Sequence, residues 1–249
     1  MKKNSNFYLN ISLLIAVHLK TEVPQLNKTI NSIYLQKGIP SEIIIILDGP
    51  IKKDLNNYLK NINKIKKNII ITKININKGL GFALNHGIQK SKYDIIARLD
   101  PEDEIINNRF FVQKKEFDLN SNLSICGSYI YEKFFKKNKL IKRPIDNIKI
   151  YKSLKSSNPI IHSSVMFRKK DILSVGGYPH ILKCQDYLLW ILCKEKKLIF
   201  KNIDKPLLKT KLDIEMMKRR NYKYFKFEQQ AYKHMLKNFD ISRRHYYKL

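Results

Sequence analysis

A dense group of carboxylates follows an apolar stretch in the segment Arg98-Leu99-Asp100-Pro101-Glu102-Asp103. Hard divalent cations such as Mg²⁺ and Mn²⁺ prefer carboxylate and phosphate oxygens, and a cation held by such acids can offset the charge of a departing diphosphate. The same residues also suit a solvated turn before a helix that begins near Ile105, because carboxylates are favourable at a helix N-terminus. These residues alone leave both interpretations open.

Asp186 is a second candidate for chemistry. It follows Gln185 at the start of an apolar helix predicted over 185–194. A carboxylate at this place can remove the proton of an attacking hydroxyl, and a single such group is enough, whereas glycosidases need a pair. The alternative is a helix N-cap, which is a common role for Asp.

Other polar residues lie where predicted elements end. Asp48-Gly49-Pro50 is a turn signal after an isoleucine-rich run. Asn77-Lys78-Gly79 suggests a phosphate-binding loop but lacks the spacing of a P-loop or of a dinucleotide fingerprint. His162 falls in a predicted strand over 160–167, where a lone histidine is more often a core residue than a functional one. The scattered histidines make a zinc site an unsupported interpretation.

The elements that must position these residues follow from the apolar pattern. The first hundred residues alternate short apolar runs with amphipathic stretches, which is typical of βαβ units around a mostly parallel sheet. Strands are predicted over residues 9–17, 42–47, 68–72 and 93–99, and helices over residues 21–36 and 80–91. The Asp100 cluster therefore follows the fourth strand, at the edge of an open α/β sheet where ligands bind.

The charge of the chain allows two interpretations. The sequence has 249 residues, a net charge of +28 and 49 basic residues, of which eight are arginine. Such an excess of lysine is typical of a proteome-wide bias as much as of a basic surface. The functional use that it favours most is attraction to an anionic membrane surface.

The apolar run near the N-terminus predicts a buried strand and not a secretory signal. The run over residues 11–17 is short, is broken by Ser12 and has no small-residue cleavage site after it. No apolar stretch approaches the roughly 18 residues of a membrane span. The three cysteines have neither a paired nor a metal-binding spacing, so we expect free thiols in a reducing compartment.

Taken in order, several segments resemble those of the family-2 inverting glycosyltransferases. Over residues 10–110 the segments are Ser12-Leu-Leu-Ile-Ala16, Ser32-Ile-Tyr-Leu-Gln36, Glu42-Ile-Ile-Ile-Ile-Leu-Asp48-Gly49, Asn77-Lys-Gly79-Leu, Ala83-Leu-Asn85-His-Gly87-Ile and Leu99-Asp100-Pro-Glu-Asp103. The likeness continues through Asn158-Pro-Ile-Ile-His162-Ser-Ser-Val-Met-Phe-Arg168, Gly176-Gly177-Tyr178 and Gln185-Asp186-Tyr187-Leu-Leu-Trp190. This second set is similar to transferases that build bacterial surface polysaccharides, including lipopolysaccharide, and the likeness covers about four-fifths of the chain.

The resemblance implies a fold and an organisation. The fold is the GT-A, Rossmann-like nucleotide-diphospho-sugar transferase fold of the α/β class, with a mostly parallel central sheet flanked by helices. The catalytic domain would cover residues 1–212, with a nucleotide-sugar half over about 8–104 and an acceptor half over about 105–212. Residues 213–249 would form a basic C-terminal segment, in which Met, Tyr, Phe and Lys at helical spacing predict an amphipathic helix.

The resemblance also implies roles for single residues. Asp186 would be the catalytic base, and Asp100 with Glu102 would hold Mg²⁺ or Mn²⁺. The residues implied in binding the nucleotide sugar, with Asp48 on the nucleobase and Arg220 near the pyrophosphate, are Ala16, Asp48, Lys78, Gly79, Asn85, Arg98, Asp100, His162 and Arg220.

The sequence departs from the family pattern at two places. Glu102 stands where the family usually has Asp, and Pro101 replaces a small residue. Because the longer arm of Glu changes its reach, Glu102 and Asp103 remain alternative metal ligands. Asp48-Gly49-Pro50 replaces the common Asp-Asp-Gly-Ser, which leaves one acid instead of two.

The implied activity is inverting transfer of a hexose or N-acetylhexosamine from a nucleotide sugar, UDP-linked, to a glycan acceptor. The acceptor implied is a polyprenyl-diphosphate-linked sugar, and the place is the cytoplasm, at the inner face of the cell membrane. One alternative is an inactive family member. The other is a basic nucleic-acid-binding protein, but only residues 222–232 interleave basic and aromatic side chains, and the acidic cluster would repel phosphate. We therefore expect no nucleic-acid partner.

Overall fold

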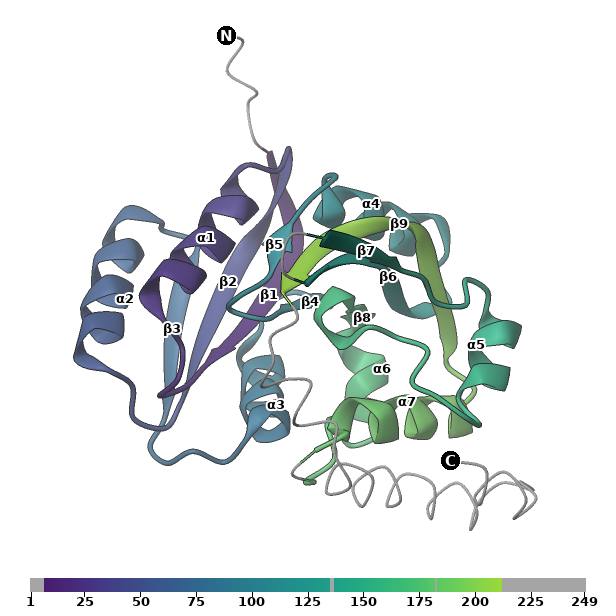
Figure 1. Cartoon of the computed structure of the whole chain (residues 1–249). Coiled ribbons are helices and arrows are strands. Elements are labelled where there is room, and N and C mark those ends of the chain that lie inside the picture. The colour runs from purple at the N-terminus through teal and green to yellow at the C-terminus, as the bar shows by residue number, and fades with distance from the viewer. Residues whose placement is uncertain (1–6, 135–136, 182, 212–249) are drawn as a thin grey trace, which may run out of the picture.

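The computed structural model describes residues 7–134, 137–181 and 183–211, and these form one α/β unit around a continuous sheet (Figure 1). The order of the strands is β3-β2-β1-β4-β8-β6-β9-β5, and β7 pairs with β6 outside this path. Strands β1, β2, β3 and β4 pair in parallel, as predicted. The rest is mixed, because β8, β7 and β5 pair antiparallel while β6 and β9 pair in parallel.

The first half alternates strands and helices, as the apolar pattern predicts. Its elements are β1 (Phe7–Val17), α1 (Val23–Tyr34), β2 (Gly38–Asp48), α2 (Lys53–Ile65), β3 (Ile69–Ile74), α3 (Leu80–Lys90) and β4 (Ile95–Leu99). Pro24 lies in the first turn of α1, where its missing N–H costs little. The predicted strand at the N-terminus is confirmed, and Ile11 to Ile15 are buried in it.

The second half contains shorter strands and completes the sheet. Its elements are β5 (Glu104–Ile105), α4 (Arg109–Leu119), β6 (Leu123–Phe134), β7 (Lys137–Ile141), α5 (Asn147–Ser153), the 3₁₀ turn η1 (His162–Ser164), β8 (Met166–Arg168), α6 (Lys169–Ser174), α7 (Gln185–Glu195) and β9 (Ile199–Lys211). The predicted helix over 185–194 is α7. The predicted amphipathic helix over 215–239 lies outside the described residues.

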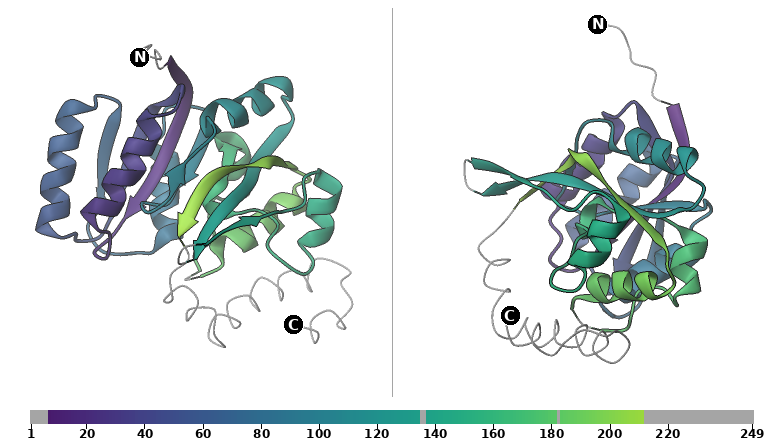
Figure 2. Two further views of the ribbon diagram at one scale, coloured as in Figure 1. Left: turned by 45° about the horizontal axis from the view of Figure 1, so that its top comes forward. Right: turned by 90° about the vertical axis from the view of Figure 1, so that its right-hand side faces the viewer.

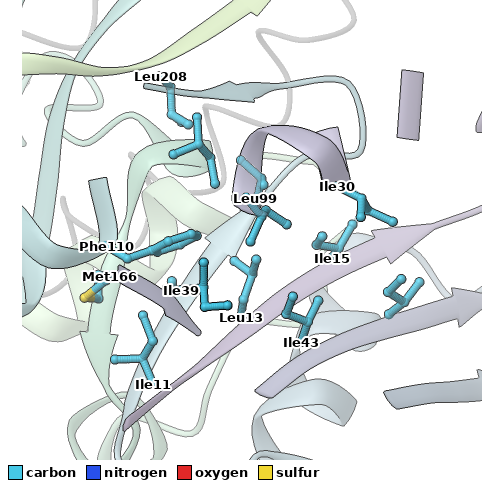
Figure 3. Close-up of a cluster of buried hydrophobic side chains, with 14 of the residues drawn as sticks. Ile11, Leu13, Ile15, Ile30, Ile39, Ile43, Leu99, Phe110, Met166 and Leu208 are labelled. Atoms are coloured by element: carbon cyan, nitrogen blue, oxygen red, sulfur yellow. The ribbon is translucent and has the colours of Figure 1, made fainter. Parts of the chain in front are cut away.

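The central strands are apolar on both faces because helices cover both (Figure 2). Successive side chains of a strand point to opposite faces. Leu13 of β1 therefore packs in the core beneath α1, α2 and α4, whereas Leu14 packs in the core beneath α3, α6 and α7. Figure 3 shows the first core, in which Leu13, Ile43 and Leu99 from three neighbouring strands meet.

This alternation decides which end residues of the strands share a face. Ala16 of β1, Asp48 of β2 and Arg98 of β4 alternate with residues of the first core, such as Ile15 and Leu99. The three side chains therefore belong to the face that carries α3 and α7. All three lie at or beside the carboxyl end of their strand.

The helix predicted to begin near Ile105 begins instead at Arg109. Glu104 and Ile105 form the short strand β5, which pairs with Lys209 and Leu208 of β9. This pairing joins residues about one hundred positions apart, so no local pattern announces it. The acidic cluster therefore does not cap a helix.

The strand predicted over 160–167 is also wrong for most of its length. His162 begins the 3₁₀ turn η1, and only Met166 to Arg168 pair as a strand. Most apolar residues of this segment are buried, with Ile161 only partly so, but the Ser164 hydroxyl and backbone N–H both donate to the carbonyl of Ile161. These local bonds compete with strand pairing.

The free thiols predicted for the cysteines are confirmed, and Cys126, Cys184 and Cys193 are all buried. Burial raises the pKa of the Cys126 thiol to about 12. Among the helices that the structure describes, none is both long and apolar enough to cross a bilayer.

Candidate active site

A cavity of about 600 Å³ opens at the carboxyl ends of β1, β2 and β4. It is lined by Ala16, Val17, His18, Lys20, Thr21, Glu22, Gln25, Asp48, Leu80, Arg98, Asp100, Pro101 and Glu102. The structure thus brings together five of the residues predicted for donor and metal binding. A smaller cavity, of about 350 Å³, lies at the opposite end of β1 and β4, away from all of them.

Asp48 fixes the loop between β3 and α3. Its two carboxylate oxygens accept hydrogen bonds from the backbone N–H groups of Lys78, at 2.8 Å, and Gly79, at 3.0 Å. Gly49 has a φ of 84°, and a side chain there would lie 2.6 Å from the backbone nitrogen of Asn77. The sequence therefore folds this turn so that Asp48, Lys78 and Gly79 form one wall beside the cavity.

Arg98 and Asp100 form an ion pair at the cavity. The Arg98 side chain is only 3% exposed, whereas Asp100 is 36% exposed and can meet a ligand. Glu102 is exposed and lines the same cavity. Asp100 and Glu102 thus offer hard oxygen ligands toward one space.

The two acids fit a cation that a substrate helps to hold. Within the described ranges, no group of three or more His, Cys, Asp or Glu side chains is arranged to hold a metal ion. Mg²⁺ is commonly bound by one or two carboxylates together with substrate phosphates. The donor set of Asp100 and Glu102 matches this second type of site.

Asp103 points away from the cavity. It is 3% exposed, its side chain bonds Ser163, and its backbone carbonyl accepts a bond from the Thr29 hydroxyl at 2.8 Å. Burial, followed by the charge of Asp100, raises the pKa of Asp103 well above its usual range. Of the two alternative metal ligands, Glu102 is therefore the one that faces the cavity.

Two buried residues of α4, Arg109 and Gln113, bond the backbone next to the site, and we did not predict them. The buried Arg109 guanidinium donates to the carbonyl of Arg98, at 2.8 Å, and to that of Val165, at 3.1 Å. Gln113 accepts from Arg109 and donates to the carbonyls of Cys126 and Ser164. Burial lowers the pKa of Arg109 to about 9. Their i,i+4 spacing places them on one helix face, but it does not show that this face is buried.

Asp186 lies in the first turn of α7, half-buried. The N-cap residue is Cys184, so the simple N-cap role considered for Asp186 is not what the structure shows. Asn158 donates to Oδ2 of Asp186 at 2.8 Å. Burial raises the pKa of Asp186, while the bond from Asn158, the backbone N–H of Tyr187 and the charge of Arg98 act in the opposite direction.

His162 and Asn85 meet at Tyr178. Nε2 of His162 lies 2.9 Å from the Tyr178 hydroxyl, and the Asn85 amide bonds both the N–H and the carbonyl of Tyr178. Burial and the charge of Arg98 hold the pKa of His162 well below its usual value. Tyr178 is thus bonded to α3 through Asn85 and to η1 through His162.

Arg98 links these residues to the cavity. It lines the cavity, and its charge acts on Asp186, Tyr178 and His162. The N-terminus of α3 also lies against the start of α7 and the segment before it, since Gly81 packs against Gln185 and Tyr178. Arg220, the last residue predicted for this site, lies outside the described residues.

Comparison with known proteins defines the class. The chain matches the family described as Glycosyl transferase family 2 over residues 12–177, which is about two-thirds of its length. The chain therefore belongs to glycosyl transferase family 2. The match spans β1 to the glycines before Tyr178, and so includes the cavity.

Bacterial relatives resemble most of the chain. An amylovoran biosynthesis glycosyltransferase, AmsE of Erwinia amylovora, is 29% identical over 224 residues, covering 89% of this chain and 84% of the relative. The UDP-Gal:alpha-D-GlcNAc-diphosphoundecaprenol beta-1,3-galactosyltransferase of Escherichia coli is 31% identical over 211 residues, covering 84% and 76%. The chain is thus a glycosyltransferase similar to enzymes of bacterial surface polysaccharide synthesis.

Solved structures confirm the GT-A fold. The S. aureus TarS 1-349 complex with UDP-GlcNAc superposes with a TM-score of 0.70 at 14% identity, over 95% of this chain and 69% of that one. The mannosyltransferase PcManGT from Pyrobaculum calidifontis, in complex with GDP-Man and Mn²⁺, gives a TM-score of 0.64 at 11% identity, over 88% and 60%. At these identities the likeness concerns the fold.

Proposed function

We propose that this chain transfers a hexose or N-acetylhexosamine from a UDP-sugar to a glycan acceptor with inversion at the anomeric carbon. The observation that carries the proposal is the cavity at the carboxyl ends of β1, β2 and β4, with Asp100 and Glu102 on its wall and Arg98 linking it to Asp186. One face thus offers donor-binding acids and a separate, half-buried carboxylate.

The donor occupies the 600 Å³ cavity in this proposal. The wall formed by Asp48, Lys78 and Gly79 lies beside the nucleobase, and Ala16 and Arg98 border the sugar diphosphate. UDP is supported as the carrier by the UDP-Gal named for the E. coli relative and by the UDP-GlcNAc complex of the structural neighbour. Within this proposal Asn85 and His162 act by holding Tyr178, and Arg220 stays a prediction for the diphosphate.

Asp100 and Glu102 would hold Mg²⁺ or Mn²⁺ together with the donor diphosphate. When bound, such a cation neutralises charge on the leaving diphosphate. Arg98 would add a fixed positive charge of the protein near the donor diphosphate, because it is buried and already paired with Asp100.

Asp186 is the base. It takes the proton of the acceptor hydroxyl while that oxygen forms a bond to the anomeric carbon. The bond from this carbon to the diphosphate oxygen breaks on the opposite face, and UDP leaves with the electron pair. One carboxylate satisfies this balance, which is why a second acid near Asp186 is unnecessary.

The acceptor is a lipid-diphosphate-linked sugar, such as a polyprenyl-diphosphate sugar, in this proposal. It is supported by the diphosphoundecaprenol-linked acceptor named for the E. coli relative. The enzyme would then work in the cytoplasm at the inner face of the membrane, where its charge of +28 attracts anionic lipid. Residues 1–212 form the catalytic domain and 213–249 a basic segment for that surface.

A donor panel tests the proposal. Thermal unfolding is followed with UDP-galactose, UDP-GlcNAc, UDP-glucose and GDP-mannose, each with and without Mn²⁺, since a ligand that binds only the native state must stabilise it. We expect a UDP-sugar to raise Tm by several degrees, with a larger shift when Mn²⁺ is present. No shift with any of the donors would contradict the proposal and favour an inactive family member.

A further inference from the structure

The segment between α5 and η1 faces the N-terminus of α7 through Asn158. The side-chain amide of Asn158 is used at both ends: Nδ2 donates to Oδ2 of Asp186 at 2.8 Å, and Oδ1 accepts from the backbone N–H of Ile160 at 3.2 Å. The bond to Ile160 defines which end of the amide is the acceptor. It therefore directs the N–H₂ group toward Asp186.

The backbone that carries Asn158 is anchored on a buried residue of β9. Asn202, which is fully buried, donates from Nδ2 to the carbonyl of Pro159 at 3.0 Å and to that of Pro144 at 2.6 Å. Pro159 is itself buried. Asn158 is thus the residue that immediately precedes a point fixed to the sheet.

The other end of the segment is anchored on the donor side. His162 bonds the Tyr178 hydroxyl, and Asn85 of α3 bonds the backbone of Tyr178 at its N–H and its carbonyl. The segment from Asn158 to His162 is therefore held between β9 and α3. Such two-sided anchoring keeps the amide in place when Asp186 changes its protonation state.

The charges around Asp186 oppose each other. Burial favours the neutral acid, whereas a base must be ionised when the acceptor arrives. Arg98 on β4 acts in favour of the ionised form, and Tyr178, which also interacts with Asp186, has its own pKa raised by burial. Among the contacts that favour the carboxylate, the bond from Asn158 comes from a side chain and acts more strongly than the backbone N–H groups of Tyr187 and Asp186.

We propose that Asn158 is a positioning residue for the base: it orients the Asp186 carboxylate toward the acceptor and keeps it ionised at neutral pH. This inference rests on the proposed function, because it assigns Asn158 to the step in which Asp186 takes a proton. Asn158 itself touches no reacting atom in this proposal.

The test is the pH dependence of kcat, measured as UDP release from pH 5 to 9 with saturating UDP-sugar, Mn²⁺ and a GlcNAc-diphospholipid acceptor. Asn158→Ala removes the donated bond, so the acid limb of the profile should move up by about one pH unit or more. Asn158→Asp keeps an acceptor for Ile160 but replaces the donor with a second acid, so the shift should be larger. In both variants kcat should recover toward the native value as pH rises, with a remaining loss at high pH that reports the orientation of the carboxylate, and KM for the donor should stay within about twofold.

The controls separate three outcomes. Ser157→Ala changes the neighbouring exposed residue, which bonds Ser153, and should leave the profile unmoved. Native-like profiles in both Asn158 variants, with Asp186→Asn inactive, would overturn the positioning role alone. Native-like activity in Asp186→Asn would overturn the base assignment itself. If Asn158→Ala does not fold, as judged by circular dichroism, the profile of Asn158→Asp decides.

Discussion

At the scale of single residues, Arg98 is a buried cation on the wall of the cavity. It is buried at the end of β4 and pairs with Asp100 at the cavity, and its Nε atom has no hydrogen-bond partner within the described part of the chain. Its charge acts on Asp186 and His162 across the same face. One guanidinium therefore acts on both the proposed donor site and the proposed base.

Asp100 and Glu102 should differ from each other in a predictable way. Asp100→Asn removes a negative charge from both the cation and Arg98, so the Mn²⁺-dependent part of donor binding should fall at least tenfold. Glu102→Gln leaves the Arg98–Asp100 pair intact and should give a smaller loss. Calorimetric titration of UDP-sugar with and without Mn²⁺ measures both. Equal donor affinity in all three proteins would contradict the assignment.

His162 gives a prediction on stability. Its pKa is depressed in the folded chain by burial and by Arg98, whereas the unfolded chain protonates it near its usual value of about 6.5. The free energy of unfolding is therefore unaffected by His162 above that pH. This free energy decreases as pH falls below it, by up to about 1.4 kcal/mol per pH unit, because the unfolded chain then binds a proton that the folded chain does not. His162→Gln should flatten the dependence in urea unfolding from pH 7.5 to 5. Parallel curves for the two proteins would count against this account.

At the scale of elements, hydrogen bonds between Asn85 and Tyr178 join α3 to the turn before α7. Gly176 and Gly177 have φ values of 88° and 76°, which favour glycine, and they set the turn that presents Tyr178 to Asn85. An added side-chain carbon at Gly177 would lie 2.5 Å from Oδ1 of Asn85. The neighbouring Gly176 has open space in the described structure.

This difference supplies a matched pair of substitutions. Gly176→Ala and Gly177→Ala should each lose about 1–2 kcal/mol through the positive φ, and Gly177→Ala should lose at least about 1 kcal/mol more through the clash. In an Asn85→Ala background, which itself costs about 1–3 kcal/mol in hydrogen bonds, that extra loss should vanish. Urea unfolding of the single and double variants measures the coupling. Equal losses for the two glycine variants would contradict the close contact between Gly177 and Asn85.

The sequence predicts most helices and strands of this fold, but it does not predict which distant strands pair with each other. The isoleucine run in β2 predicts a strand buried on both faces, because β-branched residues favour strands and no polar alternation interrupts them. The pairing of β5 with β9 depends on residues distant in the chain, and the turn at His162 depends on competing local hydrogen bonds. The apolar periodicity therefore predicted neither of them.

The same limit applies to the site. The place of Asp48 and Asp100 at one edge of the sheet could be predicted, because each lies at the carboxyl end of an apolar strand and parallel strands bring these ends together, whereas the family resemblance alone implied their roles. Arg109 and Gln113 could not, since charged residues on a helix are usually solvated and only the packed structure shows their burial. Asn158 gave no signal apart from its place in a motif.

At the scale of the whole molecule, the net charge of +28 is the basis for the proposed attraction to an anionic membrane. Deleting residues from Glu215 onward removes much of the basic aromatic segment, so binding to vesicles with 30% phosphatidylglycerol should weaken and lose part of its salt dependence. Co-sedimentation at low and high salt measures this, with thermal unfolding to confirm that the shortened chain is folded. Unchanged partitioning would contradict a membrane role of this segment.

The proposed role of Asp186 as the base is tested most directly by comparing sugar transfer and donor binding in the native chain and in Asp186→Asn. The measurement is UDP release with UDP-sugar, Mn²⁺ and a GlcNAc-diphospholipid acceptor, beside the donor Kd from calorimetry. We predict that Asp186→Asn lowers kcat by about 100-fold or more, while the donor Kd stays within about twofold of the native value. Native-rate UDP release from Asp186→Asn would contradict the account.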